Sequence, residues 1–280
     1  MDAAQLATFE AVIREGSFDA AARALHLTPS AVSQRIKALE QTVGQVLVRR
    51  SKPAEPTEAG QALVRLAGQI ALLSREALAA ARGTAAAGER TRLSVVVNAD
   101  SLLSWFLPVL TAVPGADFDL HQEDQDHTAD LLRSGTAMAA VTAQRVAVQG
   151  CRVEPLGAMR YRPVAAPGTF TGFATTPMIV FNRKDRLQHR FLAAQGFGDA
   201  TPPTHYIPAS ASFVEAVRLG LGWGLIPEQQ LTDDLVEIAP GHPVDVPLYW
   251  QYWRMESTVL AELTKAVRKA AAAALYSTPA

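Results

Sequence analysis

Residues 17–44, SFDAAARALHLTPSAVSQRIKALEQTVG, constrain the fold of this chain more than any other segment. Ser17 is a good N-cap, and the apolar face that follows it in FDAAARAL predicts one short helix. Thr28 and Pro29 predict the start of a second helix, because a capping hydroxyl precedes a proline at the first helical position. This second helix ends before Gly44, a residue type that commonly ends helices. Two short helices joined by a tight turn indicate a helix-turn-helix.

The flanking segments extend this unit to a winged form. Leu6, Phe9 and Ile13 recur at helical spacing and predict an additional helix before the motif. After the motif comes VLVRRSKPAEPTEAG, whose short apolar alternation, basic cluster and two prolines indicate a small β wing. Residues 23–52 contain six basic residues and one acidic residue, Glu40, a local charge of +5 in a chain whose formal net charge is −1. Any contact with nucleic acid must therefore come from this local basic surface.

The helix predicted over residues 29–43 presents short polar side chains opposite its apolar stripe. Such donors and acceptors can reach base edges in the major groove, and a basic wing can hold phosphates with a salt-dependent affinity. The candidate DNA-binding residues are Thr28, Pro29, Ser30, Ser33, Gln34, Lys37, Arg49, Arg50 and Lys52. The alternative is a helical hairpin with a solvated charged face. The capping signals, the helix lengths and the wing together favour DNA binding.

A long helix without proline is predicted over residues 57–82. Its apolar residues follow alternating steps of three and four, which is the seam pattern of a coiled coil. The candidate dimerisation residues are Leu63, Leu66, Ile70 and Leu73. The alternative is that this helix packs on its own domain. Residues 83–91, GTAAAGERT, are rich in small residues and are predicted to form a hinge.

Beyond the hinge, strand-like apolar runs alternate with helical patterns. LSVVVN, FDLHQE and MAAVTA are predicted strands, separated by helices over residues 102–110 and 129–133. This order indicates a mostly parallel sheet with helices on its faces. Similar signals recur in PMIVFN, THYIP and WGLIPE, with a helix over residues 213–219, and predict a second lobe across a crevice. We therefore expect an α/β fold with a winged helix-turn-helix at residues 1–58, a linker helix and hinge at 59–90, lobe I at 91–161 and 255–280, and lobe II at 162–254.

Composition excludes several classes of protein. A single cysteine, Cys151, cannot form an intrachain disulfide, and no window approaches twenty consecutive apolar residues. The start of the chain, MDAAQLATFE, has no basic stretch followed by an apolar run. We expect a cytoplasmic protein without membrane contact.

Motifs that carry catalysis are absent from the sequence. There is no GxSxG, HExxH, P-loop or complete GxGxxG motif, and the six histidines are scattered. We therefore expect no enzyme activity, no metal and no cofactor. A redox sensor is a second alternative, since Cys151 could still form a sulfenic acid or an intermolecular bond. A third is an architectural DNA-binding protein that needs no ligand, although it would leave the two-lobed domain without a task.

The segment SFDAAARALHLTPSAVSQRIKALEQTVGQVLVRR resembles the N-terminal domain of LysR-type transcriptional regulators, as does TEAG at the start of the linker helix. NADSLLSWFLP, EDQDHT, GLGWGLIPE and VPLYWQYWR resemble the branch of this family that regulates lysine and arginine exporters. The resemblance implies an effector domain of two Rossmann-like lobes, similar to periplasmic binding proteins. It also implies homotetramers, built from the homodimers expected above, that bend promoter DNA and respond to a small-molecule co-inducer. RNA polymerase is a further expected partner.

The expected effector site lies beyond the carboxyl ends of the strands, where ligands bind in open α/β sheets. Asp100 and Ser101 follow LSVVVN at a helix start whose free N–H groups suit a carboxylate, and Glu123 and Asp124 follow FDLHQ and suit an ammonium or guanidinium group. A ligand with both ends is a basic amino acid, so the predicted effector is L-lysine or L-arginine. The candidate effector-binding residues are Asp100, Ser101, Trp105, Glu123, Asp124, Asn182, Asp185, Ser210 and Trp223. Ordinary core packing is the alternative for Trp105 and Trp223, and helix capping is the alternative for Asp100.

An acidic run without Lys or Arg surrounds part of this site. Its members are Asp117, Asp119, Glu123, Asp124, Asp126 and Asp130. Strand alternation predicts that Asp117 and Asp119 lie on the surface. Asp126 and Asp130 are expected to favour the start of the next helix. Only Glu123 and Asp124 are placed to meet a ligand.

Overall fold

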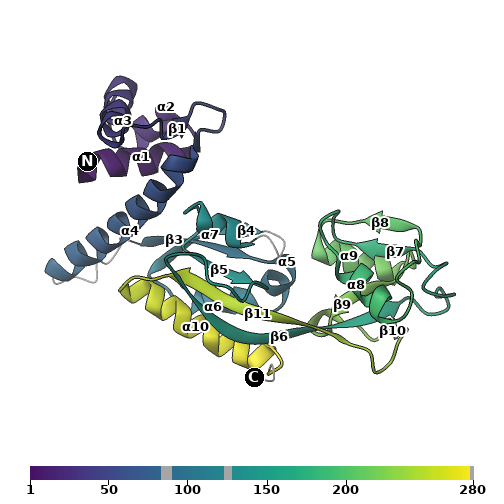
Figure 1. The fold of residues 1–280 in the computed structure, drawn as a ribbon. Coiled ribbons are helices and arrows are strands. Elements are labelled where there is room, and N and C mark those ends of the chain that lie inside the picture. The colour runs from purple at the N-terminus through teal and green to yellow at the C-terminus, as the bar shows by residue number, and fades with distance from the viewer. Residues whose placement is uncertain (83–89, 123–127, 278–280) are drawn as a thin grey trace.

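The computed structural model describes residues 1–82, 90–122 and 128–277. Its first part, which we call the head, is a winged helix-turn-helix (Figure 1). The head contains α1 (Ala3–Glu15), α2 (Phe18–Ala24), α3 (Pro29–Val43), β1 (Val48–Arg49) and β2 (Glu55–Pro56). The two strands pair antiparallel as the predicted wing. Buried apolar residues from all three helices and the wing form one core in the head.

The caps of the head agree with the sequence. The Ser17 and Thr28 hydroxyls accept hydrogen bonds from the backbone N–H groups of Ala20 (3.1 Å) and Ala31 (3.2 Å). Gly44 ends α3 with φ 77°, a left-handed conformation that favours glycine. The linker helix α4 (Glu58–Ala81) begins after its N-cap Thr57 and is 24 residues long.

Lobe I is built on three parallel strands. β3 (Thr91–Val97) lies between β4 (Ala116–Gln122) and β5 (Ala139–Thr142). A helical run follows β3 and consists of α5 (Ala99–Ser101), the π-helical turn η1 (Leu102–Phe106) and α6 (Leu107–Thr111). This run begins before the predicted residue 102. Helices α7 (Thr128–Arg133) and α10 (Thr258–Ala274) complete the lobe.

Two long antiparallel strands, β6 (Cys151–Ala165) and β11 (Val244–Trp253), run through both lobes (Figure 1). They make the sheet mixed, so the prediction of a mostly parallel sheet is wrong. Its seven strands follow the order β10-β6-β11-β5-β3-β4, and β9 also pairs with β6. The predicted lobe boundaries at residues 161 and 254 lie within β6 and just after β11.

Proline explains why the sequence analysis did not predict these two strands. β6 contains Pro155 and Pro163, and β11 contains Pro247, whereas proline normally argues against a central strand because it cannot donate to the ladder. The register shifts between Leu248 and Tyr249, where the pairing moves from Gly157 to Pro155. This irregularity in the ladder lies at Pro155, and β-bulges commonly occur where a ladder is interrupted in this way.

Lobe II contains a short parallel pair, β7 (Met178–Val180) and β8 (Thr204–Tyr206). β9 (Gly224–Pro227) and β10 (Val236–Glu237) pair antiparallel with β6. The helices of the lobe are α8 (Leu187–Ala194), α9 (Ser210–Arg218) and the 3₁₀ turn η2 (Glu228–Gln230). The predicted strands PMIVFN, THYIP and WGLIPE correspond to β7, β8 and β9, whereas α8 and β10 were not predicted.

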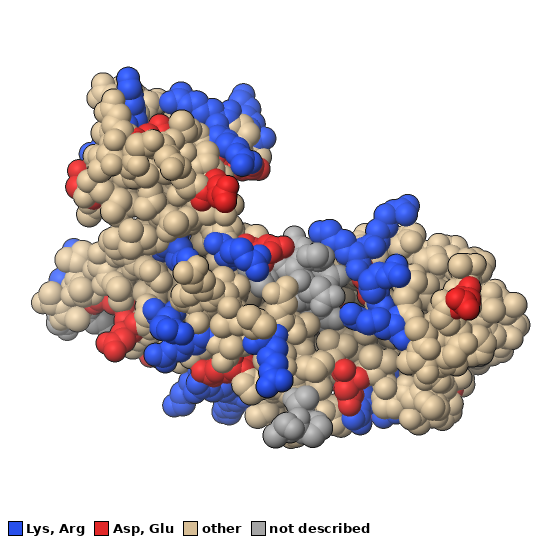
Figure 2. Space-filling model, in the orientation of Figure 1, with Lys and Arg blue, Asp and Glu red and all other residues tan. Residues whose placement is uncertain are grey.

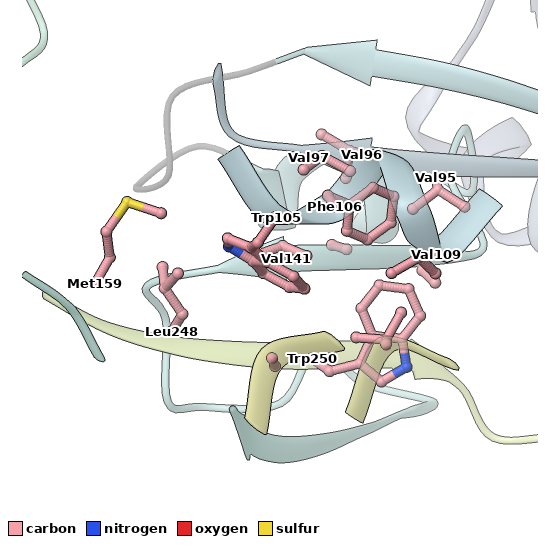
Figure 3. Packing of buried hydrophobic residues seen from close by; sticks show 14 of the residues in the cluster. Val95, Val96, Val97, Trp105, Phe106, Val109, Val141, Met159, Leu248 and Trp250 are labelled. Carbon is pink, nitrogen blue, oxygen red and sulfur yellow. The ribbon is translucent and has the colours of Figure 1, made fainter. Parts of the chain in front are cut away.

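The core of lobe I lies between the sheet and its helices (Figure 3). Val95, Val96 and Val97 of β3 are fully buried, as the continuous apolar run predicts for a central strand. Phe106 packs against Trp105 with ring centroids 5.6 Å apart and against Trp250 of β11 at 6.4 Å. Among the described helices, none combines the length and apolar character that crossing a membrane requires.

Candidate functional site

The recognition surface of the head is the outer face of α3. Val32, Ile36 and Leu39 are buried against the head, while Ser30, Gln34 and Lys37 are exposed, and Ser33 is half-buried. Thr28 and Pro29 form the start of α3, and the Thr28 hydroxyl also lies 3.0 Å from the Ser30 hydroxyl. The amino-terminal part of α3 therefore presents polar side chains where a recognition helix meets base edges.

The wing carries its cations beside this helix. Arg49, Arg50 and Lys52 are exposed, and Figure 2 shows Lys and Arg side chains gathered along the outer edge of the head. The Arg50 guanidinium lies 4.9 Å from the centroid of the Phe18 ring. Exposed cations of this kind are free to meet phosphates and give a salt-dependent affinity.

Two charged side chains near the wing have structural contacts. Glu40 accepts hydrogen bonds through Oε1 from the backbone N–H groups of Leu47 (2.8 Å) and Val48 (3.4 Å), so it holds the wing against α3. Arg35 donates from Nη1 to the Thr8 hydroxyl on α1 at 3.4 Å. Arg35 is thus part of the packing between α1 and α3, although its charge counted toward the predicted basic surface.

The candidate effector cleft lies at the carboxyl ends of β3 and β7, between the two lobes. Its volume is about 580 Å³, including space open to solvent. Side chains from both lobes and from β6 line it. They are Asn98, Ala99, Asp100, Tyr161, Phe181, Asp185, Leu187, Gln188, Ser210, Phe213, Val214, Leu225, Pro227 and Gln230. Two of these lining residues are acidic and none is Lys or Arg.

Asp100 connects the two lobes across this cleft. Its Oδ1 accepts a hydrogen bond from the Ser210 hydroxyl of lobe II at 2.8 Å, and its Oδ2 accepts one from the Tyr161 hydroxyl of β6 at 2.8 Å. Asp100 and Ser210 were both predicted from their positions after strands. Their contact closes the lobes toward one another through a charged group.

Asp185 is the second carboxylate of the cleft. Its oxygens accept hydrogen bonds from the backbone N–H groups of Leu187 (2.8 Å) and Phe181 (3.3 Å). Asn182 does not line the cleft, contrary to its prediction, because its Oδ1 accepts from the N–H groups of Lys184 (2.8 Å) and Asp185 (3.1 Å). Asn182 therefore holds the turn that positions Asp185.

Neutral polar groups of the cleft lack partners among the described residues. Asn98 and Gln188 are 4% and 2% exposed, and their Oδ1 and Oε1 atoms are buried without a hydrogen bond. The amide of Gln230 is in the same state. Buried polar atoms normally have partners, so these three are available to a ligand. Burial and the nearby Arg186 lower the pKa of His189, the next residue on α8.

Several predicted effector residues lie elsewhere. Trp105 is 4% exposed and packs in the core of lobe I. Trp223 is fully buried beside Phe173 and Phe191, with ring centroids at 5.2 and 5.9 Å. Ser101 is also fully buried and does not line the cleft. Both tryptophans and Ser101 are therefore corrections to the predicted site.

Glu123 and Asp124 lie outside the described residues, as does Asp126. The other acids of the run pair with bases. Asp117 forms an ion pair with Arg90, and Asp119 with Arg92 at 2.8 Å. Arg92 belongs to β3, and Arg90 directly precedes that strand. The parallel pairing of β3 with β4 places both bases beside the acids of β4, with Arg92 opposite Asp117. Asp130 lies in the first turn of α7 and pairs with Arg133.

The sequence analysis missed four polar residues of the cleft. Asn98 stands at the end of LSVVVN, one residue before the segment that was considered, so strand-end logic could have found it. Gln188 and Gln230 lie on α8 and η2, whose patterns were not recognised. Tyr161 lies inside a proline-containing strand, and no local signal marks it.

The predicted dimer seam lies along one face of α4. Leu63, Leu66 and Ile70 are half-buried, Leu73 is 40% exposed, and Leu63 packs against the head core. Leu72, by contrast, is fully buried in the core of lobe I. One face of α4 therefore packs on its own chain, while the seam keeps apolar surface available.

Known families match both parts of the chain. The description "Bacterial regulatory helix-turn-helix protein, lysR family" matches residues 3–61, and "LysR substrate binding domain" matches residues 86–275. The chain therefore belongs to the LysR family of DNA-binding transcriptional regulators, and it is not an enzyme.

Individual relatives resemble the chain over nearly its whole length. The HTH-type transcriptional regulator LysG of Mycobacterium tuberculosis is 49% identical over 99% of this chain and 95% of its own length. The crystal structure of ArgP from Mycobacterium tuberculosis has a TM-score of 0.88 at 47% identity, covering 99% of this chain and 100% of that chain. Full-length LysG from Corynebacterium glutamicum with bound effector arginine has a TM-score of 0.80 at 41% identity, with coverages of 99% and 100%. The predicted fold class and the resemblance to the exporter-regulator branch are confirmed.

Proposed function

We propose that this LysR-family regulator binds lysine or arginine in the cleft between its lobes and controls the export or metabolism of basic amino acids. The observation that carries the proposal is the charge of the cleft, whose described lining residues include Asp100 and Asp185 and no Lys or Arg. Both carboxylates are half-buried, and two negative charges in one partly desolvated cleft favour a cationic ligand over an anionic one.

A basic amino acid fits this set of groups better than a neutral one. It carries two cationic groups, the α-ammonium and the side chain, which can each meet one of the two carboxylates. Its α-carboxylate needs donors, and the Gln188 and Gln230 amides are uncharged donors that line the cleft. An acidic amino acid would add a side-chain carboxylate to its α-carboxylate, in a cleft that already holds the carboxylates of Asp100 and Asp185.

The LysG of Corynebacterium glutamicum supports the choice of ligand. The LysG structure from Corynebacterium glutamicum holds arginine as its effector. That organism's LysG is described as a lysine export transcriptional regulatory protein and is 43% identical over 97% of this chain. Lysine and arginine are therefore the first ligands to test for this chain.

Binding would act by favouring one arrangement of the two lobes. Asp100 already joins Ser210 across the cleft, so a ligand seated beside it would bias the closed arrangement. In the proposed division, the winged helix-turn-helix spans residues 1–58, the linker and hinge 59–90, lobe I 91–161 and 255–280, and lobe II 162–254. Leu63, Leu66, Ile70 and Leu73 would pair two linker helices, and two such dimers would form a tetramer on promoter DNA in contact with RNA polymerase. Such a regulator works in the cytoplasm, where its DNA lies.

Calorimetric titration of the full chain with arginine, lysine, citrulline and glutamate tests the proposal. Citrulline has the shape of arginine without the side-chain charge. We expect arginine or lysine to bind at least about tenfold more tightly than citrulline, which corresponds to about 1.4 kcal/mol, and glutamate to bind most weakly. Tighter binding of glutamate than of arginine and lysine would mean that this LysR-family regulator has a different class of effector.

A further inference from the structure

The linker helix α4 enters two separate cores. Near its start, Val64 is buried in the core of the head, and Leu63 packs against it. Two turns later, Leu72 is fully buried in the core of lobe I. Figure 1 shows α4 running from the head along lobe I, toward the end where α10 begins. The 24-residue helix thus connects the domain that reads DNA with the domain that holds the cleft.

Gly68 allows α4 to approach lobe I closely. A Cβ atom at this position would lie 2.8 Å from Cη2 of Trp253, at the end of β11. Trp253 itself is 1% exposed and has little room to move. A glycine in a helix interior lowers helix stability by about 1 kcal/mol relative to alanine, so close packing against Trp253 offers a reason for its presence.

Arg65 and Glu76 hold the helix on either side of this contact. Arg65 donates from Nη1 to the backbone oxygen of Gln149 in lobe I. Glu76 accepts hydrogen bonds from the Ser257 hydroxyl (2.7 Å) and from the backbone N–H groups of Val259 (3.1 Å) and Thr258 (3.3 Å). A residue of α4 therefore caps α10, because these N–H groups belong to its first turn and have no intrahelical partner.

These contacts lie on one side of α4. Arg65, Gly68, Leu72 and Glu76 follow steps of three, four and four, so they share one face of the helix. The predicted dimer seam is displaced by about 130° around the helix axis from this face. One helix can therefore pair with a second copy and remain attached to its own lobe I.

The head and lobe I border a cleft beside α4. Glu10, Ile13 and Arg14 of α1 line one side, and Arg92 and Asp119 of β3 and β4 are among the lining residues of lobe I. The cleft has a volume of about 790 Å³, including open solvent. Because this space separates α1 from the sheet there, α4 provides the packed connection between the two domains.

We propose that Arg65, Gly68, Leu72 and Glu76 form a latch that fixes α4 to lobe I of the same chain, so that the head and lobe I move as one body. Lobe II is then the part that moves relative to that body when the cleft closes. Closure of the cleft then changes the position of lobe II relative to the head, and a loosened latch separates ligand binding from the DNA response.

Amide hydrogen exchange on the full chain tests the latch without any ligand. Glu76→Ala removes the acceptor of the Thr258 and Val259 N–H groups, and we expect these two amides to exchange at least about tenfold faster. Gly68→Val, which forces a side chain against Trp253, should speed exchange in the second half of α4. The controls are Glu262→Gln, an exposed charge removed from α10, and Ala62→Val, an exposed side chain enlarged on α4. Wild-type exchange rates in both latch variants overturn the proposal.

Arginine-dependent operator binding tests the coupling, and this part rests on the proposed function. We expect both latch variants to bind arginine within about twofold of wild type, while the arginine-induced change in operator affinity shrinks at least about threefold. Both controls should keep the full response. A helix cap with only a structural role would change exchange at Thr258 and Val259 and leave the arginine response intact, which contradicts coupling. If wild type did not bind arginine, the proposed function would fail, and hydrogen exchange would still decide whether the latch exists.

Discussion

Replacement of Asp100 by asparagine tests cation recognition in the cleft, because it keeps the size of the side chain and removes its charge. Asp100 lines the cleft and accepts hydrogen bonds from Tyr161 and Ser210, both at 2.8 Å. A cation about 4 Å from this carboxylate gains about 4 kcal/mol at an effective dielectric constant of about 20. Desolvation of the two charges cancels part of this gain. We expect Asp100→Asn to lose about 1.4–2.8 kcal/mol of arginine binding, which is about a 10- to 100-fold higher Kd.

Isothermal titration calorimetry at fixed pH and salt concentration measures this loss. Asp117→Asn is the matched control, since it removes a carboxylate that pairs with Arg90 on the surface of lobe I and does not line the cleft. The control should bind arginine as wild type does. An Asp100→Asn protein whose Kd for arginine stays within about twofold of wild type would refute the role of Asp100 in reading charge.

Four further outcomes are expected. Gln34→Ala should lower the preference for operator over random DNA. Arg49→Ala should weaken binding to both DNAs and reduce the slope of log affinity against log salt concentration by about one, as measured by fluorescence anisotropy. An unchanged slope would show that the wing does not contact DNA. Glu40→Ala deletes the acceptor of two wing N–H groups and should lower the free energy of unfolding by about 1.5–3 kcal/mol in urea titrations, against no change if the wing holds without it. Ile70→Asp should dissociate the dimer in sedimentation velocity, and a persisting dimer would show that the seam lies elsewhere. Burial lowers the pKa of His189, so its neutral ring contributes stability above its unfolded pKa of about 6.5, and this stability is lost as the pH falls through the lower folded pKa. The Tm of His189→Gln should therefore fall less than that of wild type between about pH 7 and about pH 5. An equal fall in both proteins would contradict this.

The helices and the wing of the head could be predicted from the sequence because local signals determine them. Ser17, Thr28 and Gly44 act within a few residues of their own helix ends, and the observed caps use those same side chains and that same glycine. Winged helix-turn-helix geometry depends on such short-range chemistry. The sequence therefore predicted every helix of the head and its wing.

The sheet of the effector domain depends on long-range pairing, which local patterns do not specify. β11 pairs with β5 and β6, about a hundred residues away in the chain, and its proline concealed it. The same limit applies to the acidic run, where Asp117 and Asp119 find Arg90 and Arg92 across a parallel register. No pattern within the run could reveal those partners.

The lining of the candidate cleft was predicted in part, for a related reason. Strand-end logic located Asp100, Asp185 and Ser210, because the carboxyl ends of neighbouring strands meet at one edge. It failed for Trp105 and Trp223, since aromatic residues near a strand end also fill the core. Whether such an aromatic residue lines a cleft or fills the core depends on how side chains from other elements pack around it, and local sequence patterns do not determine that packing.

The most direct test of the central claim is the affinity of the full chain for its operator, measured with arginine, lysine, citrulline and glutamate at equal concentrations. If an acid-lined cleft controls the head, arginine should change the operator affinity by about fivefold or more. Citrulline should have a smaller effect, and glutamate should have none. An operator affinity that responds to glutamate and ignores both arginine and lysine would contradict the account.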